Sequence, residues 1–317
     1  MKKTLLLFGF QKKQISQLKS QFKNKINFLT DNNLKNKKIT SIDAIVGITR
    51  RGFLEFLKKN LFEKKIYPNW IHLPGAGVEE YTIFKNLKIN FTNGKIIQGV
   101  QVSEHAVALL LSLTRNLVPI LKKGINVKFT RRPIEIRGKK ALIYGYGGIG
   151  QLLAEKLKSF GLDVYALNGN YVPIDSNISD LYLDSDLVKA IKNKDFLFIT
   201  SPLTSENLKV FNYEKLKLLN KNSIVINVSR GKLLCLESLH RCIKENKVFG
   251  AGLDVTDPEP LPKKHKLFKF ENFIYSPHIA GISDNFSKRN VELITKNINR
   301  YINNKNLINI VNLNLGY

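Results

Sequence analysis

Three ionisable residues in the second half of the chain have the types needed to reduce a keto acid. Arg230, Glu259 and His278 each come after a short apolar run that is typical of a buried strand. Arginine offers a permanent charge and a planar fork that matches a carboxylate, whereas histidine exchanges a proton near neutral pH. A carboxylate beside the histidine stabilises its charged form, which can then protonate a carbonyl oxygen. Together these residues predict a site that reduces a 2-keto acid.

A glycine loop precedes this set. Gly145, Gly147 and Gly150 have the spacing G-x-G-x-x-G, directly after the apolar run ALIY and before a helical segment. In this context the first glycine permits a tight turn, the second lets the backbone approach a pyrophosphate, and the third lets helix and strand pack closely. The phosphates would lie on amide groups at the helix N-terminus. The loop therefore predicts a bound dinucleotide rather than a structural turn.

An asparagine stands where a dinucleotide-binding unit usually has an acidic residue. That residue follows the loop by about 20 positions and holds the ribose 2′-hydroxyl. Here the position is Asn168, in the run VYALNGN. Asparagine can bind a hydroxyl but does not repel a 2′-phosphate, while residues 168–172 contain no arginine or lysine to select that phosphate. The sequence leaves NAD and NADP both open, and the other interpretation of Asn168 is a plain turn residue.

Strand-like and helix-like segments alternate from residue 139 to about residue 281. The strand-like runs are ALIY, DVYAL, LYL, DFLFIT, SIVINVS, VFGAGLDV and NFIYS. Regular alternation of this kind predicts a parallel, doubly wound sheet. Ligands of such sheets lie at the carboxyl ends of the strands, which is where Arg230, Asp254, Glu259 and His278 are expected.

The first third of the chain has its own α/β pattern. The apolar runs TLLLFGF, INFLT, DAIVGIT, NWIHLPG and KINFTNG alternate with lysine-rich helical segments such as FLEFLKKNLF. At GVQVSEHAVALLLSLTRNL the pattern changes to a long apolar helix, with Ser103 as its candidate N-cap, and a second domain is expected to begin near Gly99. The closing run NFSKRNVELITKNINRYI predicts one amphipathic helix that packs back on the first domain.

Composition excludes several classes of protein. The net charge is +26, but the lysines are dispersed among asparagines, which favours a solvated basic surface over a specific nucleic-acid site. Such a surface still attracts anionic substrates and phosphorylated cofactors. The N-terminal MKKTLLLFGF is interpreted as a first strand rather than a signal peptide, and no run is long enough to span a membrane. Cys235 and Cys242 fit neither a redox pair nor a metal-ligand pair, so we expect a cytoplasmic protein without a metal.

Residues from roughly 70 to 281 resemble the D-isomer-specific 2-hydroxyacid dehydrogenase family. The motifs LPGAGVEEY, VSEHAVALLL, YGYGGIG, SPLTSEN, INVSRGKLL, GLDVTDPEPLP and SPHIAG occur in the family's order. The resemblance implies two flavodoxin- or Rossmann-like lobes with doubly wound parallel sheets. The resemblance implies that a dinucleotide-binding domain at 99–281 is inserted in a discontinuous substrate domain at 1–98 and 282–317. It also implies a homodimer built largely through the helix near 103–117.

The resemblance also assigns roles to residues. Arg230 would bind the substrate carboxylate and carbonyl, His278 would be the acid/base, and Glu259 would orient and charge it. The backbone of Ala76 and Gly77 would hold the substrate carboxylate. Asp254 would bind the nicotinamide carboxamide, and the expected cofactor residues are Gly145, Gly147, Gly148, Ile149, Gly150, Asn168, Pro202, Thr204, Val228, Ser229, Asp254 and Gly281.

The expected activity is hydride transfer between NAD or NADP and C2 of a small D-2-hydroxy or 2-keto acid. Glu259 argues against the formate dehydrogenase branch, which usually has glutamine there, whereas Asn168 and GVEEY depart from the family's common pattern. The length favours a glyoxylate or hydroxypyruvate reductase, or a glycerate dehydrogenase. Phosphoglycerate dehydrogenase and a non-catalytic, cofactor-sensing corepressor-like protein stay as alternatives.

The remaining histidines have plainer interpretations. His72 and His105 lie on apolar elements and are expected to be packed or near the site rather than catalytic, while His240 and His265 fall in lysine-rich surface segments. Glu104 precedes His105 on a helix, so the two side chains point about 100° apart and cannot face each other.

Overall fold

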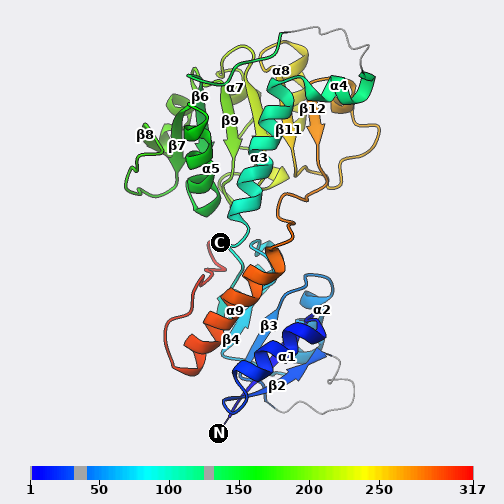
Figure 1. The fold of residues 1–317 in the computed structure, drawn as a ribbon, viewed down its shortest axis with the longest axis vertical. Helices are drawn as coiled ribbons and strands as arrows, with labels where there is room; N and C mark the ends of the chain where they lie inside the picture. The colour runs from blue at the N-terminus through cyan, green and yellow to red at the C-terminus, as the bar shows by residue number, and fades with distance from the viewer. Residues whose placement is uncertain (1, 32–40, 125–131, 317) are drawn as a thin grey trace. The chain divides into compact units, whose positions relative to one another are not determined.

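The computed structural model describes residues 2–31, 41–124 and 132–316 of the 317-residue chain. The chain divides into two compact units, one formed by Met1–Gln98 with Ser283–Tyr317 and the other by Gly99–Ile282 (Figure 1). Each unit is built around its own parallel sheet. The predicted fold class, in which one α/β lobe is inserted in a discontinuous second lobe, is confirmed. No helix among the described residues is long and apolar enough to cross a membrane.

The first unit contains five strands in the order β2-β1-β3-β4-β5, and every neighbouring pair is parallel. The strands are β1 (Lys3–Phe8), β2 (Ile26–Thr30), β3 (Ala44–Gly47), β4 (Trp70–His72) and β5 (Asn90–Thr92). Side chains alternate between the two faces of a strand, so Leu6 packs in one core while Leu5 and Leu7 pack in the other. Each strand overlaps one of the five apolar runs of the first third.

Helices cover both faces of this sheet. On one face lie α1 (Lys12–Gln21) and α9 (Phe286–Ile302), which contributes Ile294 and Ile298 to the core. On the other face lie α2 (Phe53–Leu57), the π-helical turn η2 (Lys58–Phe62) and the 3-10 helix η3 (Glu79–Phe84). The closing helix therefore packs on the first unit, as its amphipathic pattern predicted.

The second unit contains seven parallel strands in the order β12-β11-β10-β9-β6-β7-β8. They are β6 (Lys140–Tyr144), β7 (Asp163–Asn168), β8 (Asp180–Leu183), β9 (Phe196–Ile199), β10 (Ile224–Asn227), β11 (Gly250–Leu253) and β12 (Phe273–Tyr275). Each overlaps a strand-like run of the sequence. The order reverses between β6 and β9, as in a doubly wound sheet, in which ligands generally bind at the reversal point.

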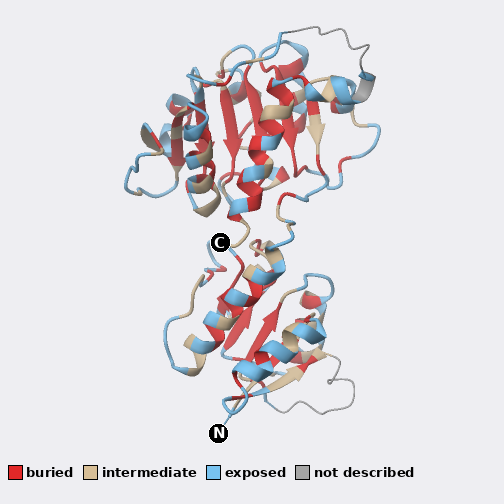
Figure 2. Cartoon of the chain, viewed as in Figure 1, coloured by how far each residue is buried: buried red, intermediate tan, exposed pale blue. Residues whose placement is uncertain are grey.

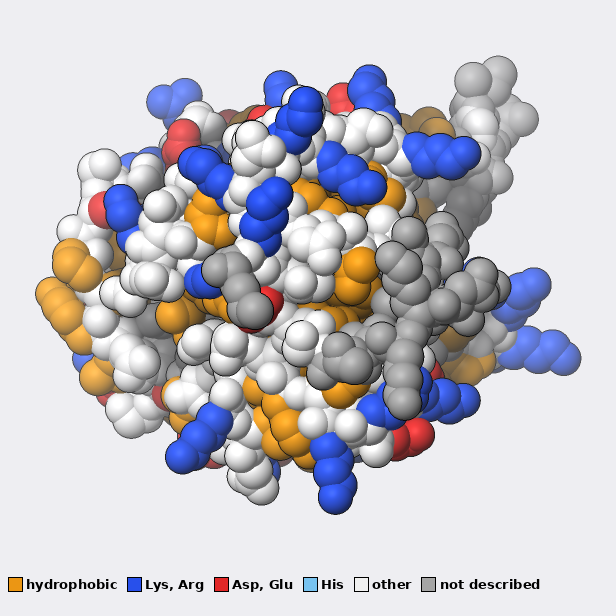
Figure 3. Space-filling view, turned by 90° about the horizontal axis from the view of Figure 1, so that it is seen from below, with side chains coloured by type: hydrophobic (Ala, Val, Ile, Leu, Met, Phe, Trp, Pro, Cys, Tyr) orange, Lys and Arg blue, Asp and Glu red, His pale blue; other side chains and the backbone are white. Residues whose placement is uncertain are grey.

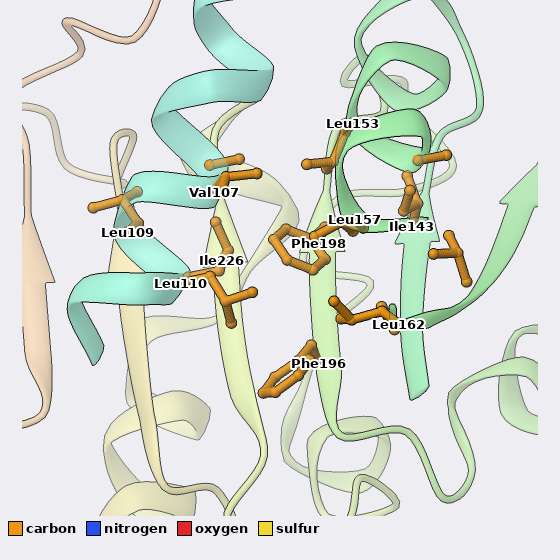
Figure 4. Packing of buried hydrophobic residues seen from close by; sticks show 14 of the residues in the cluster. Val107, Leu109, Leu110, Ile143, Leu153, Leu157, Leu162, Phe196, Phe198 and Ile226 are labelled. Atoms are coloured by element: carbon orange, nitrogen blue, oxygen red, sulfur yellow. The ribbon is translucent and has the colours of Figure 1, made fainter. Parts of the chain in front are cut away.

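Helices cover both faces of this sheet, and an apolar core lies between the sheet and the helices on each face. The helical elements are α3 (Gly99–Thr114), α4 (Leu117–Lys123), α5 (Gly148–Ser159), η5 (Asp184–Asp186), α6 (Leu187–Ile191), α7 (Tyr213–Leu216), η6 (Gly231–Leu233), α8 (Leu236–Lys244) and η7 (Lys266–Lys269). The central strands β6, β9, β10 and β11 are almost wholly buried, whereas the edge strands β8 and β12 are mostly not (Figure 2). In the core beneath α3 and α5, Leu110 lies beside Ile226 and Leu157 lies close to Phe198 (Figure 4).

The long apolar helix α3 begins earlier than its sequence suggested. Ser103 was predicted as its N-cap, which is wrong, because the helix begins at Gly99. Gln101 and Val102 are buried, and this packing extends the helix toward the N-terminus. The hydroxyl of Ser103 instead donates to the carbonyl of Val100 at 2.8 Å, as serine does inside a helix.

A glycine lets α3 come very close to β11. A Cβ atom at Gly252 would lie 2.9 Å from Cβ of Leu109, closer than real Cβ atoms pack. Because Leu109 Cβ is fixed to the helix backbone, the helix can hold this position only beside a residue without a side chain.

Charged side chains are dispersed on the surface. On the face shown in Figure 3, lysine and arginine side chains stand apart among uncharged groups. This agrees with the dispersed lysines of the sequence.

His72 is packed inside the first unit. The ring is fully buried, and its Nδ1 lies 2.8 Å from Oγ1 of Thr92, which also accepts a hydrogen bond from Nε1 of Trp70. The Thr92 hydroxyl is thus a hydrogen-bond partner shared by Trp70 and His72. Burial lowers the pKa of His72 to about 4.

The burial of His72 predicts acid sensitivity of the first unit. Below about pH 6.5 the unfolded chain protonates this histidine, whereas the folded chain binds the proton only below about pH 4. The free energy of unfolding therefore decreases as the pH is lowered from about 6.5 to about 4. The expected loss is about 3 kcal/mol. Urea unfolding followed by the fluorescence of Trp70, the single tryptophan, measures it. His72→Leu is expected to flatten the profile, and an equally steep decrease in that variant would contradict the assignment.

Candidate active site

The carboxyl ends of three neighbouring strands carry the predicted acid/base and charged residues. β10, β11 and β12 are adjacent and parallel. Arg230 follows β10, Asp254 comes directly after β11, and His278 follows β12. Because the carboxyl ends of parallel strands meet at one edge of the sheet, the fold brings these residues to the same edge of the second unit.

His278 pairs with Glu259 at this edge. Nδ1 of the imidazole lies 2.5 Å from Oε1 of the carboxylate. The two side chains are 44% and 37% exposed, so both can meet a ligand. A carboxylate bound at Nδ1 fixes the orientation of the ring and leaves Nε2 available. The pair has the geometry of a general acid/base that exchanges its proton through Nε2.

Asp254 fixes the backbone that carries His278. Its carbonyl oxygen accepts a hydrogen bond from the amide of His278 at 2.8 Å. Its carboxylate accepts from the amides of Ile279 and Ala280, each at 3.0 Å. His278 has a φ of 56°, in the left-handed region that L residues seldom adopt. Bonds to three consecutive amides hold this segment in its unusual conformation.

Arg230 ends a turn that Asn227 holds in place. The buried side chain of Asn227 donates to the carbonyl of Arg230 at 2.9 Å and accepts from the amide of Ser229 at 3.1 Å. A Cβ atom on Gly231 would lie 2.0 Å from the carbonyl carbon of Thr256. The backbone of the turn after β10 therefore packs in direct contact with the backbone of the segment after β11. Arg230 itself donates from Nη1 to the carbonyl of Ser229 at 2.7 Å.

Sequence reasoning did not single out Asn227. Its signal is an amide at the end of the apolar run SIVINVS, because a buried amide must find hydrogen-bond partners. The partners in the turn could not be named from the sequence.

The glycine loop has the geometry that a dinucleotide requires. Gly145 has a φ of 103°, and a Cβ atom there would lie 2.5 Å from the amide nitrogen of Ser201. A Cβ atom on Gly150 would lie 2.2 Å from the carbonyl oxygen of Gly145. At Gly147 nothing lies within 4 Å of that position. The open space is at the one glycine expected to admit a pyrophosphate, at the start of α5 where Gly148 and Ile149 follow.

Asn168 lies at the end of β7 and contacts the glycine loop. Its Oδ1 accepts a hydrogen bond from the amide of Tyr146 at 3.1 Å, and its Nδ2 donates to the carbonyl of Asn170 at 2.9 Å. The side chain therefore helps to fix the loop.

The other predicted cofactor residues lie at the same edge of the sheet. Pro202 and Thr204 follow β9, and Asn207 joins them by donating to the carbonyl of Pro202 and accepting from the amide of Thr204. Val228 and Ser229 are buried after β10. The carbonyl of Gly281 accepts from Nε2 of Gln101 at 3.0 Å. Within the described ranges, no group of three or more His, Cys, Asp or Glu could hold a metal ion.

Ala76 and Gly77 belong to the first unit and follow β4. The carbonyl of Ala76 accepts from Nδ2 of Asn93 at 2.7 Å, and that of Gly77 accepts from Nη2 of Arg50 at 2.9 Å. Both carbonyls are thus held by side chains of the same unit.

The sequence of the second unit matches a known family. Residues 107–280 match the NAD binding domain of the D-isomer specific 2-hydroxyacid dehydrogenases, a span of more than half the chain. The chain belongs to this family. As a D-2-hydroxyacid dehydrogenase it is an oxidoreductase, and the resemblance carried by its motifs is confirmed.

Individual dehydrogenases resemble the chain over most of its length. It is 28% identical over 274 residues to the glyoxylate reductase of Pyrococcus furiosus, covering 83% of this chain and 80% of that protein. It is 25% identical over 297 residues to D-3-phosphoglycerate dehydrogenase of Methanocaldococcus jannaschii, covering 87% of this chain and 56% of that protein.

A solved dehydrogenase has the same fold. The NADPH-dependent glyoxylate/hydroxypyruvate reductase of Sinorhizobium meliloti, solved with NADP and sulfate, superposes with a TM-score of 0.80 over both whole chains at 19% identity. At this identity the likeness shows the fold alone.

The dehydrogenase's glycines predict separate effects on folding and binding. Gly147→Ala is expected to keep the melting temperature, because its methyl group meets open space, yet to weaken NADH or NADPH binding by at least about tenfold by blocking the phosphates. Gly150→Ala is expected to lower the melting temperature, because its methyl group meets a backbone oxygen. Calorimetric titration and thermal scanning measure the two effects. Wild-type cofactor affinity in Gly147→Ala would contradict the phosphate placement.

Proposed function

We propose that the protein reduces glyoxylate or hydroxypyruvate to the corresponding D-2-hydroxy acid with NADH or NADPH. The observation that carries the proposal is the 2.5 Å pair of His278 and Glu259 at the strand ends that also hold Arg230. The name of the relative in Pyrococcus furiosus, a glyoxylate reductase, supports this choice of substrate. The nicotinamide cofactor, when bound, supplies the hydride that adds to C2.

The side chains divide the remaining work. Arg230 binds the substrate carboxylate with its planar fork. His278 gives the proton on Nε2 to the carbonyl oxygen at C2, while Glu259 keeps the ring oriented through Nδ1. Binding in this geometry makes the reaction effectively unimolecular.

The residues that we propose to bind the cofactor lie in the glycine loop and at the carboxyl ends of the strands. They are Gly145, Gly147, Gly148, Ile149, Gly150, Asn168, Pro202, Thr204, Val228, Ser229, Asp254 and Gly281. Asn168 can bind a 2′-hydroxyl and does not repel a 2′-phosphate, so both NADH and NADPH belong in the assay.

The proposal is tested by following NADH and NADPH oxidation with four keto acids. We expect turnover with glyoxylate or hydroxypyruvate. Pyruvate and phosphohydroxypyruvate complete the set, the last because D-3-phosphoglycerate dehydrogenase of Methanocaldococcus jannaschii is also a relative. A preference for phosphohydroxypyruvate would favour that second function, and no turnover with any keto acid would rule out the proposed reaction.

The role of His278 predicts a selective loss of rate. His278→Ala is expected to lower kcat by about a hundredfold or more, because a general acid contributes that much, while the affinity for cofactor stays unchanged. His240→Ala removes a histidine of α8 whose ring packs at a tilt against Phe270, and serves as the control. A wild-type rate in His278→Ala would remove this residue from the mechanism.

The proposal includes a homodimer in the cytoplasm. The expected interface is the helix near 103–117, and exposed apolar side chains where that segment continues into α4 support a second copy as the partner: Leu117, Ile120 and Leu121, the last 85% exposed. Free Cys235 and buried, free Cys242 fit a reducing compartment.

A charge on α4 is expected to separate the subunits. Leu121→Glu should halve the mass measured by light scattering after gel filtration, because a carboxylate would be buried without a partner in the interface. Glu292→Gln, a change at an exposed residue of α9 in the first unit, is the control. A wild-type protein that elutes as a monomer would overturn the dimer.

A further inference from the structure

We propose that His105 is a positioning residue for His278 and acts through Ser276 and Asp254. The inference deepens the proposed function and rests on it for the meaning of His278. It gives a role to a histidine whose type and position were otherwise explained by packing alone.

A short relay of polar groups joins α3 to the end of β11. Nε2 of His105 lies 2.7 Å from Oγ of Ser276, and that hydroxyl donates to Oδ1 of Asp254 at 2.6 Å. Nε2 of His105 is also 3.5 Å from the same Oδ1. Ser276 and Asp254 are buried, and the His105 side chain is 22% exposed. The three side chains are therefore joined by hydrogen bonds at the carboxyl ends of β11 and β12.

The protons of this relay can be assigned. Ser276 has one hydroxyl proton, and an ionised Asp254 can only accept. The proton of Ser276 therefore goes to Asp254, and its oxygen must accept from His105. This requires a proton on Nε2 of His105, so the relay runs from imidazole to hydroxyl to carboxylate. Removing the imidazole leaves the buried hydroxyl with one partner fewer.

The carboxylate transmits this constraint to the acid. Asp254 accepts from the amides of Ile279 and Ala280, and its carbonyl accepts from the amide of His278. A carboxylate that turns away from Ser276 must also give up part of its bonds to these amides. His278 would then lose support for its φ of 56° and the placement of its ring.

The packing of α3 explains why His105 reaches this point. α3 crosses β11 where Leu109 meets Gly252. His105 lies one turn before Leu109 on the same face, and Asp254 lies two residues beyond Gly252, directly after the strand. Glu104, the neighbour of His105, is exposed.

The kinetic test uses two substitutions at the same position. His105→Leu removes the donor and is expected to lower kcat with the preferred keto acid by about 10- to 100-fold, because a small misplacement of a catalytic group costs that much. The KM for cofactor should change little. His105→Gln keeps an N–H donor near the position of Nε2 and should restore most of the rate. Glu104→Gln should match the wild type.

A second measurement needs no turnover. In the cofactor-free protein, ¹⁵N NMR should show His105 protonated at Nε2. His105→Leu and Ser276→Ala should both shift the amide signals of Ile279 and Ala280 and speed their hydrogen exchange, whereas His105→Gln should not. Ser276→Ala keeps the test informative if His105→Leu does not fold.

The two measurements separate the two proposals. Loss of thermal stability in His105→Leu with unchanged amides at 279 and 280, or a glutamine variant as slow as the leucine variant, would overturn the positioning role. The predicted amide changes in a protein that reduces no keto acid would uphold that role and overturn the proposed function.

Discussion

A buried carboxylate, that of Asp254, holds together the strand ends that carry the proposed site in the second unit. Asp254 is 1% exposed, and an ionised group in such a place is stable only when hydrogen bonds replace the water that it has lost. A serine hydroxyl and two consecutive amides supply those bonds. Because the amides belong to the segment of His278, the same hydrogen bonds satisfy the buried charge and place the residue that we propose as the acid.

Buried support and exposed chemistry are separated at this edge. Asn227, Asp254 and Ser276, which fix the backbone, are buried, whereas Glu259 and His278 stay partly open to solvent. A buried polar group cannot change partners without a large loss of free energy, so the support is rigid. An accessible imidazole can exchange its proton with a ligand or with water, which a catalytic cycle requires.

Local sequence patterns predicted the strands and the glycine loop, but not the hydrogen bonds between residues that are far apart in the sequence. The strands of both sheets appeared as short apolar runs, because strands covered by helices on both faces need nearly continuous apolar sequence. The glycine loop was recognisable because each glycine has its own local steric cause. The start of α3 was mispredicted, since packing of Gln101 and Val102 outweighed the cap signal of Ser103. His105 and Ser276 are separated by 171 positions, and only the tertiary fold pairs them.

Because residue 252 is a glycine, α3 lies close to β11, and this closeness sets how long the donor side chain at position 105 has to be. An imidazole spans a fixed distance from the helix backbone, and it meets Ser276 only while the helix lies this close to β11. A methyl group at 252 would push the helix away from the strand, and a longer donor would then be needed at 105. Positions 105 and 252 are therefore expected to covary among homologues. They are 147 residues apart in the sequence, and their side chains do not touch.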